Sequence, residues 1–323
     1  MRSGILLVSI FQNRNWVLGD FGRQIISRSK QVEQIWIFSA YARNKKSKNL
    51  PLRPLPLFEG YIFTYLTVFQ AYLSKDAIKF RNRSIVLYLH NELEELGSIE
   101  EQLEVMKWAH AIYFMCSKDA QVFLDAGLDV SKVRLMYFAY DEKRLIPNPT
   151  SAPPRTILLA SKFGPRKGLS IFPSLVNTLK DWHFIVTGKG WERFIEENGL
   201  KLAKNFVYVP FKKRANYEIY TRARIFLSLS NLEGGPVPLL EAMAMNLVPV
   251  VTNTGFACDL IKQGENGILL PINPSEELVK NELLNALDIK STDNSFILSL
   301  TWDRICKIIQ SDLALIRFRE GSV

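Results

Sequence analysis

Short apolar runs alternate with amphipathic stretches along most of the chain, which is the pattern of repeated β-α-β units. In the first half, this pattern predicts strands at Ile5–Ile10, Gln34–Phe38, Ile85–Leu89, Ala111–Cys116 and Val133–Tyr137, and helices at Val68–Phe80 and Ser117–Ala126. The aromatic-rich stretch Phe58–Phe69 stays open between helix and strand.

The second half has a clearer pattern of six apolar runs. They predict strands at Thr156–Ala160, His183–Thr187, Val207–Pro210, Ile225–Leu229, Val248–Thr252 and Ile268–Leu270. Each run is continuously apolar, as expected of parallel strands that are covered on both faces. Right-handed crossovers then predict a doubly wound sheet, and the amphipathic stretch Trp302–Leu315 predicts a last helix.

The chain has 323 residues, which is more than one hydrophobic core usually organises. The stretch Leu145–Arg155 contains four prolines among small polar residues and is typical of a linker. We therefore expect an α/β protein with two Rossmann-like doubly wound domains. Residues 1–148 would form the first, and residues 149–323 the second with the terminal helix.

The formal net charge of +9 favours anionic partners. No zinc finger or RNP motif is present, so nucleic acid is not expected. The cysteines, Cys116, Cys258 and Cys306, lack metal-ligand spacing and fit a reducing compartment as buried apolar side chains. The N-terminal apolar run is short for a signal peptide, and no run approaches the roughly 18 residues that span a bilayer. The expected location is cytoplasmic, with peripheral binding to the inner membrane face as an option.

Two groups of basic residues, the first without intervening acids, suggest where a membrane could bind. They are Arg43, Lys45, Lys46, Lys48 and Arg53 in a proline-broken loop, and Lys75, Lys79, Arg81 and Arg83 on or after a helix. An anionic membrane surface would attract such groups. Solvated surface charge explains them almost equally well.

Two glutamates, Glu233 and Glu241, mark the strongest candidate site, within NLEGGPVPLLEAMAMNLVPVV. Glu233 follows a strand, and the helix that starts after two glycines contains Glu241. A helix start offers free N–H groups and a positive dipole end, which suit a phosphate. Glu241 would accept hydrogen bonds from a ribose. The expected backbone donors are Gly234, Gly235, Val237 and Leu239.

Three further segments follow strands, where ligands bind in such sheets. The loop with Lys162, Arg166 and Lys167 suits a diphosphate, and a solvated basic loop is an equal alternative. Gly188, in VTGKG, fits a tight turn better than a binding loop. His90 ends an apolar strand, with structural and functional interpretations equally supported.

Other chemistries find little support. The chain has no G-x-S-x-G, P-loop or G-x-G-x-x-G motif. Its three histidines are not spaced as metal ligands, and no two aspartates lie two positions apart. We therefore expect no metal and no cofactor.

The second half resembles the retaining group 1 glycosyltransferases, also called glycosyltransferase family four, of GT-B fold. The motif that carries most of the resemblance is LSNLEGGPVPLLEAMA, which is similar to the family's S-x-x-E-G-x-x-x-x-x-L-E-A-M-A. ASKFGPRKG, VTGKG and NTGFACDLIKQGENGILLP resemble further family motifs in the same order. In the first half, residues 108–141 are similar to a family stretch, whereas the first 85 residues are not recognisable.

The resemblance implies a cleft between two domains, with the C-terminal helix packing back across it. The substrate would be a UDP- or GDP-sugar, transferred with retention to a glycan or a lipid-linked acceptor. Implied catalytic residues are His90, Lys167 and Glu233. Implied donor-binding residues are Lys162, Gly188, Ser230, Gly234, Gly235, Val237, Leu239 and Glu241.

The chain departs from the family pattern at three single residues and in one loop. Lys162 replaces an arginine, Phe256 a glycine and Asp259 a glutamate, and no glycine-rich loop is found near Ile10–Gly22. Two alternatives remain. One is a nucleotide-sugar epimerase of the same fold, with His90 and Glu92 or Glu94 as acid and base. The other is a degenerate nucleotide-sugar-binding partner protein.

Overall fold

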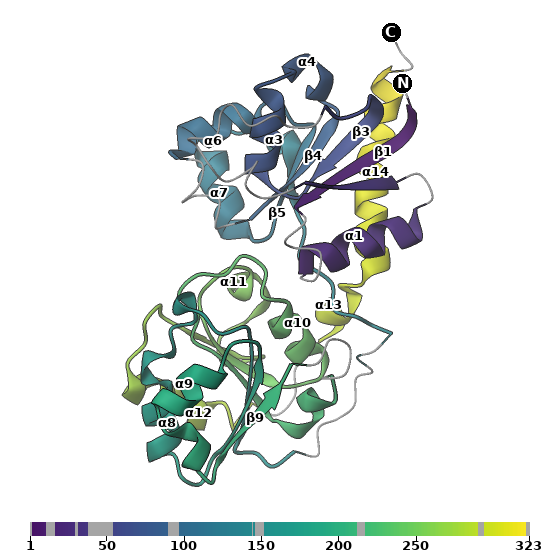
Figure 1. Cartoon of the computed structure of the whole chain (residues 1–323). Helices are drawn as coiled ribbons and strands as arrows, with labels where there is room; N and C mark the ends of the chain where they lie inside the picture. The colour runs from purple at the N-terminus through teal and green to yellow at the C-terminus, as the bar shows by residue number, and fades with distance from the viewer. Residues whose placement is uncertain are drawn as a thin grey trace. The chain divides into compact units, whose positions relative to one another are not determined.

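The protein forms two compact units, each described here by itself. The structure, a computed structural model, describes residues 2–10, 17–29, 32–37, 54–89, 97–143, 145, 152–211, 217–289 and 294–320. The first unit combines Met1–Phe138 with Trp302–Val323, and the second is Ala139–Thr301 (Figure 1). Among the described helices, none is both long and apolar enough to cross a bilayer.

The first unit contains a six-stranded parallel sheet in the order β2-β1-β3-β4-β5-β6. Its strands are β1 (Arg2–Ile10), β2 (Val32–Ile37), β3 (Phe58–Phe63), β4 (Ser84–Tyr88), β5 (Ala111–Phe114) and β6 (Val133–Leu135). Its helices are α1 (Val17–Arg28), α3 (Leu66–Leu73), α4 (Ala77–Phe80), α6 (Ile99–Met106), α7 (Ser117–Asp125) and α14 (Trp302–Glu320). Helices α1 and α14 cover one face, and α3, α6 and α7 cover the other (Figure 1).

The aromatic stretch that the pattern left open contains both kinds of element. Phe58–Phe63 forms β3, between β1 and β4, and α3 begins at Leu66. Tyr61 and Phe63 of β3 are fully buried and pack against Phe80. A strand in the middle of the sheet is buried on both faces, which explains its lack of alternation.

The single helix expected at Val68–Phe80 is two helices. Helix α3 ends at Leu73, and α4 starts at Ala77. Asp76 caps α4, because its side chain accepts a hydrogen bond of 3.1 Å from the N–H of Lys79. Aspartate favours such N-cap positions, and this local competition breaks the helix.

The second unit contains another six-stranded parallel sheet, in the order β12-β11-β10-β7-β8-β9. Its strands are β7 (Thr156–Ala160), β8 (His183–Gly188), β9 (Phe206–Pro210), β10 (Ile225–Ser228), β11 (Val248–Thr252) and β12 (Ile268–Leu270). All six lie where the apolar runs predicted them, within a residue at either end. The fold class expected from the sequence, two Rossmann-like doubly wound units, is confirmed.

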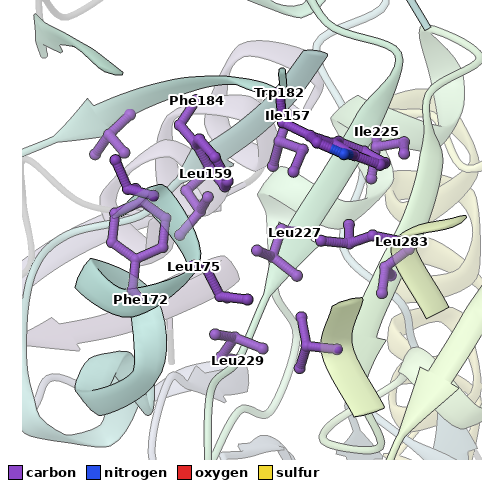
Figure 2. Packing of buried hydrophobic residues seen from close by; sticks show 14 of the residues in the cluster. Ile157, Leu159, Phe172, Leu175, Trp182, Phe184, Ile225, Leu227, Leu229 and Leu283 are labelled. Carbon is purple, nitrogen blue, oxygen red and sulfur yellow. The ribbon is translucent and has the colours of Figure 1, made fainter. Parts of the chain in front are cut away.

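The helices of the second unit are α8 (Phe172–Thr178), α9 (Glu192–Glu197), α10 (Val237–Ala244), α11 (Ala257–Leu260), α12 (Glu276–Asn285) and α13 (Ser295–Ser299). The apolar faces of α8, α9 and α12 meet the sheet in a core that includes Phe172, Trp182 and Leu227 (Figure 2). Burial of these side chains stabilises the sheet and holds the strand ends in place.

The terminal helix differs from its expected place in the second domain. Helix α14 packs against α1 and β3 of the first unit and continues to Glu320. Asp312 on this helix is 3% exposed and accepts hydrogen bonds from the Tyr113 hydroxyl at 2.6 Å and from Arg134 at 2.8 Å. The sequence pattern could not reveal these partners, which lie about two hundred positions away. Packing across a cleft stays a prediction.

Candidate functional site

In the second sheet, the strands that follow β7 are added first on one side (β8, β9) and then on the other (β10, β11, β12). The topological switch point therefore lies between β7 and β10, and the loops after these two strands meet there. The N–H of Asn231, after β10, donates a hydrogen bond of 2.7 Å to the carbonyl of Arg166, after β7. Gly168 has φ +60, and a Cβ there would lie 1.9 Å from the carbonyl oxygen of Leu229. Only glycine allows this approach, so the two loops form one surface at the switch point.

Lys167 and Glu233 form an ion pair across this junction. Their side chains are 23% and 17% exposed, so both groups are largely withdrawn from water and still reachable by a ligand. The sequence analysis singled out each residue in a separate motif, and the fold brings them together. Lys162 lies on the same loop but is exposed and has no ion pair with another described residue.

The loop that carries Glu233 is also held from the other side. Gly255 has φ +54, and a Cβ there would lie 2.4 Å from the carbonyl oxygen of Gly234. The N–H of Phe256 donates to the same carbonyl at 3.1 Å. Phe256 stands where the family pattern has glycine, and its ring is fully buried. The replacement therefore changes the packing below the loop and keeps the backbone contact.

Ser230 is buried in the loop before Glu233. Its side chain is 2% exposed, and its carbonyl accepts a hydrogen bond of 2.5 Å from the Thr252 hydroxyl. The donor-binding role expected of Ser230 stays a prediction.

Helix α10 begins at Val237, directly after this loop. Among described residues, the N–H groups of Gly234, Gly235 and Val237 have no hydrogen-bond partner. Leu239 was expected to offer a fourth donor, and this expectation was wrong. Its N–H donates to the Pro236 carbonyl at 2.8 Å, and its side chain is buried in the core.

Asn246 ends α10 as expected, because it adopts the left-handed conformation with φ +61. The N–H of Asn246 bonds to Met243 and the N–H of Leu247 to Ala242, both at 3.0 Å. This is the Schellman arrangement, in which the last carbonyls of a helix gain partners. The helix length, and with it the position of Glu241, is therefore well defined.

Glu241 has a neighbour that the sequence analysis missed. The Tyr220 hydroxyl donates a hydrogen bond of 2.5 Å to Oε2 of Glu241. Tyr220 is 4% exposed, and its burial, with the nearby carboxylate, raises the pKa of its hydroxyl well above the usual value near 10. The phenol therefore stays protonated and remains a donor. Tyr220 lies outside the motifs and 21 positions before Glu241, so the motif analysis did not point to this contact.

Gly188, the last residue of β8, packs against the loop that follows β7. Its φ is +148, and a Cβ there would lie 1.7 Å from the carbonyl oxygen of Ser161. The same carbonyl accepts a hydrogen bond of 2.8 Å from the Trp191 ring N–H. The interpretation of Gly188 as a tight-turn residue agrees with this packing, and a direct donor contact stays a prediction.

His90, Glu92 and Glu94 lie outside the described residues, as do most of the linker and the basic residues from Arg43 to Arg53. Within the described part of the chain, His, Cys, Asp and Glu side chains form no cluster of three that could hold a metal ion. The roles given to His90 and to metal-independent chemistry stay predictions.

Comparisons with known proteins agree with this geometry. Residues 142–297 match the family model described as glycosyl transferases group 1. An uncharacterized glycosyltransferase of Haemophilus influenzae (strain ATCC 51907 / DSM 11121 / KW20 / Rd) is 30% identical over 164 residues. The match covers 45% of this chain and 44% of that protein, so the chain spans less than half of this relative.

Two solved structures share the fold over almost the entire chain. Sucrose-phosphate synthase from Thermosynechococcus elongatus has a TM-score of 0.70 at 14% identity, covering 100% of both chains. Anabaena Alr3699/HepE in complex with UDP-glucose has a TM-score of 0.64 at 16% identity, covering 99% of this chain and 100% of that one. Residues 142–297 are therefore similar to the glycosyl transferases group 1, and the two Rossmann-like units have the GT-B fold.

Proposed function

We propose that the protein is a glycosyltransferase that takes a UDP- or GDP-sugar and transfers the sugar with retention of configuration. The observation that carries the proposal is the junction of Lys167, Glu233 and the start of α10 at the switch point. Ligands of doubly wound sheets bind at such points. The UDP-glucose complex of the structurally similar HepE supports a nucleotide-sugar donor.

The diphosphate has a suitable place between Lys167 and the first residues of α10. Gly234, Gly235 and Val237 offer unpartnered N–H groups there, and the dipole of the helix favours negative charge. When the sugar bond breaks, negative charge grows on the diphosphate leaving group. Groups that are already in position stabilise that charge with little reorganisation.

The Lys167–Glu233 ion pair suggests how the donor enters. A diphosphate at Lys167 competes with the Glu233 carboxylate for the same ammonium group. Once released, the carboxylate is free to accept hydrogen bonds from hydroxyls of the transferred sugar. Donor binding would thus prepare both residues for their roles.

Glu241 is proposed to hold the ribose. One of its oxygens accepts from Tyr220, and a carboxylate has acceptor positions for more than one hydroxyl group. His90 is proposed to take part in catalysis, as the family resemblance implies. No divalent metal and no cofactor would be required.

The acceptor is proposed to be a glycan or a lipid-linked precursor of a surface polysaccharide, handled on the cytoplasmic side of a membrane. The excess of basic residues over the chain supports an anionic environment.

The proposal is tested by donor turnover with a panel of glycan and lipid-linked acceptors. A transferase releases nucleoside diphosphate in proportion to the glycosylated product. An epimerase would convert the donor without an acceptor, and a binding protein would retain it unchanged. Either of the latter results would overturn the proposed transfer reaction.

A further inference from the structure

Exposed large apolar side chains gather at one edge of the first sheet. Leu57 is 44% exposed, Ile78 86%, Trp108 37% and Val130 72%. They precede β3, β4, β5 and β6, which are consecutive neighbours in the parallel sheet. The amino ends of these strands share one edge, where α4 lies in Figure 1. We call these residues and the polar ones between them the amino-edge face.

Direct contacts join the segments of this face. The N–H of Asn82 donates to the Trp108 carbonyl at 2.9 Å, and the Arg81 guanidinium lies 5.7 Å from the centre of the Trp108 ring. Lys132 donates to the carbonyl of Lys107 at 2.9 Å. The ammonium of Lys79 bonds to the carbonyl of Leu55, just before Leu57. The exposed apolar side chains therefore belong to one connected surface.

The charges on the amino-edge face are mainly positive. Its cations are Lys75, Lys79, Arg81, Arg83, Lys107 and Lys132, and its carboxylates are Asp76, Glu104 and Asp129. Each carboxylate has a local partner. Asp76 caps α4, Asp129 accepts from the N–H of Ser131 at 2.8 Å, and Glu104 pairs with Lys107 at 2.5 Å. The face thus presents excess positive charge around separated apolar side chains.

We propose that the amino-edge face binds the surface of an anionic lipid bilayer. Aliphatic side chains and a tryptophan would enter the interface, while the long basic side chains reach the headgroups. A protein partner fits less well, because a stable interface usually buries about 800 Å² on each side around a contiguous apolar centre. Here charged groups separate the four apolar side chains.

This inference does not rest on the transferase activity, so either proposal can fail alone. It does set an orientation for the first unit. The carboxyl ends of its parallel strands lie at the edge opposite the amino-edge face. With the amino-edge face on the bilayer, those strand ends point away from the lipid.

The test is sedimentation of the full chain with vesicles of phosphatidylcholine alone or mixed with phosphatidylglycerol, at low salt. The apolar variant is Ile78→Ser with Val130→Ser, and the charge variant is Arg81→Glu with Lys107→Glu. A matched control is Lys201→Glu with Leu202→Ser, because Leu202 is 87% exposed on the second unit. Circular dichroism checks that every variant is folded.

The expected result is pelleting with anionic vesicles only. The charge variant should lose at least about tenfold in partitioning, since each basic group near such a surface contributes several-fold. The apolar variant should also lose binding, and the control should bind as the wild type does. Equal pelleting with both lipids, or loss only in the control, would overturn the inference. So would self-association without vesicle binding that the apolar variant abolishes.

Discussion

The Tyr220 hydroxyl lies 2.5 Å from Oε2 of Glu241 and donates a hydrogen bond to it. This contact links the segment before β10 to the helix after it, and it orients the carboxylate that is proposed to hold the ribose. Tyr220 would not touch the donor in this arrangement. It acts through Glu241 and is a positioning residue.

Replacing Tyr220 with phenylalanine should weaken donor binding about tenfold. The change removes a charge-assisted hydrogen bond, whose loss costs about 1.5 kcal/mol, and it preserves the ring. Calorimetry should find the loss for the ribonucleotide and a much smaller one for the 2′-deoxynucleotide, because fewer ribose contacts then depend on Glu241.

Tyr140→Phe is the matched control. The Tyr140 hydroxyl donates to the Leu298 carbonyl at 3.2 Å within the same unit, remote in sequence from α10. An equal loss of affinity in both variants, or equal losses with both nucleotides, would remove Tyr220 from the site. The raised pKa adds a pH expectation: the hydroxyl contact is fully formed below pH 10 and is lost only as pH rises beyond that.

Glu241→Gln should weaken donor binding by about 1–3 kcal/mol, since an amide accepts ribose hydrogen bonds less strongly than a carboxylate does. In combination with Tyr220→Phe, the two losses should not add. A coupling energy of about 1 kcal/mol is expected for residues in direct contact. Simple additivity in the double-mutant cycle would show that the two side chains act independently.

Gly168→Ala should destabilise the second unit far more than Gly199→Ala does. The two glycines have nearly the same left-handed φ, +60 and +63, so the conformational strain of about 1 kcal/mol is shared. A Cβ at residue 199 meets no atom within 4 Å, whereas one at residue 168 meets the Leu229 carbonyl. Denaturant unfolding measures the difference, and similar losses would contradict the close approach of the two loops.

The buried carboxylate of Asp312 should stabilise the position of α14. Asp312→Ala leaves the Tyr113 hydroxyl and Arg134 without their shared acceptor, which should cost about 3 kcal/mol in the free energy of unfolding. Ser311→Ala, at the exposed neighbouring position, is the control. If chemical denaturation shows equal stability for the two variants, the Asp312 contacts do not hold the helix.

The strands of the second unit could be predicted almost to the residue, because each is a continuous apolar run between turn residues. The same pattern failed at Val68–Phe80, where Asp76 competes for the backbone and starts a second helix. It also could not place α14, because Asp312 finds its partners on β5 and β6 rather than on the preceding domain. Local patterns carry little information on contacts between distant segments.

For the candidate site, too, the sequence identified some residues and missed others. Motif spacing identified Lys167, Glu233 and Glu241 separately, and the fold joined the first two in an ion pair. Tyr220 was missed because it belongs to none of the motifs and lies 21 positions before its partner, Glu241. Leu239 was misassigned because the sequence does not reveal which N–H groups of the first turn already have partners.

Lys167→Ala should lower turnover about a hundredfold, with a smaller effect on donor affinity. The positive charge of Lys167 stabilises the negative charge that grows on the diphosphate in the transition state. Losing one such preorganised group costs about 3 kcal/mol. Arg166→Ala should have a smaller effect, because the family pattern leaves that position free. Near-normal turnover in Lys167→Ala, or activity that is abolished by a chelator and restored by manganese, would contradict this role.

The most direct measurement of the central claim is calorimetric titration of the protein with UDP, GDP and ADP in the presence of EDTA. The account predicts that UDP or GDP binds, that Glu241→Gln and Lys167→Ala each weaken that binding, and that manganese adds nothing. Failure of all three nucleotides to bind, or binding that neither substitution changes, would contradict a nucleotide-sugar site at the junction of Lys167, Glu233 and α10.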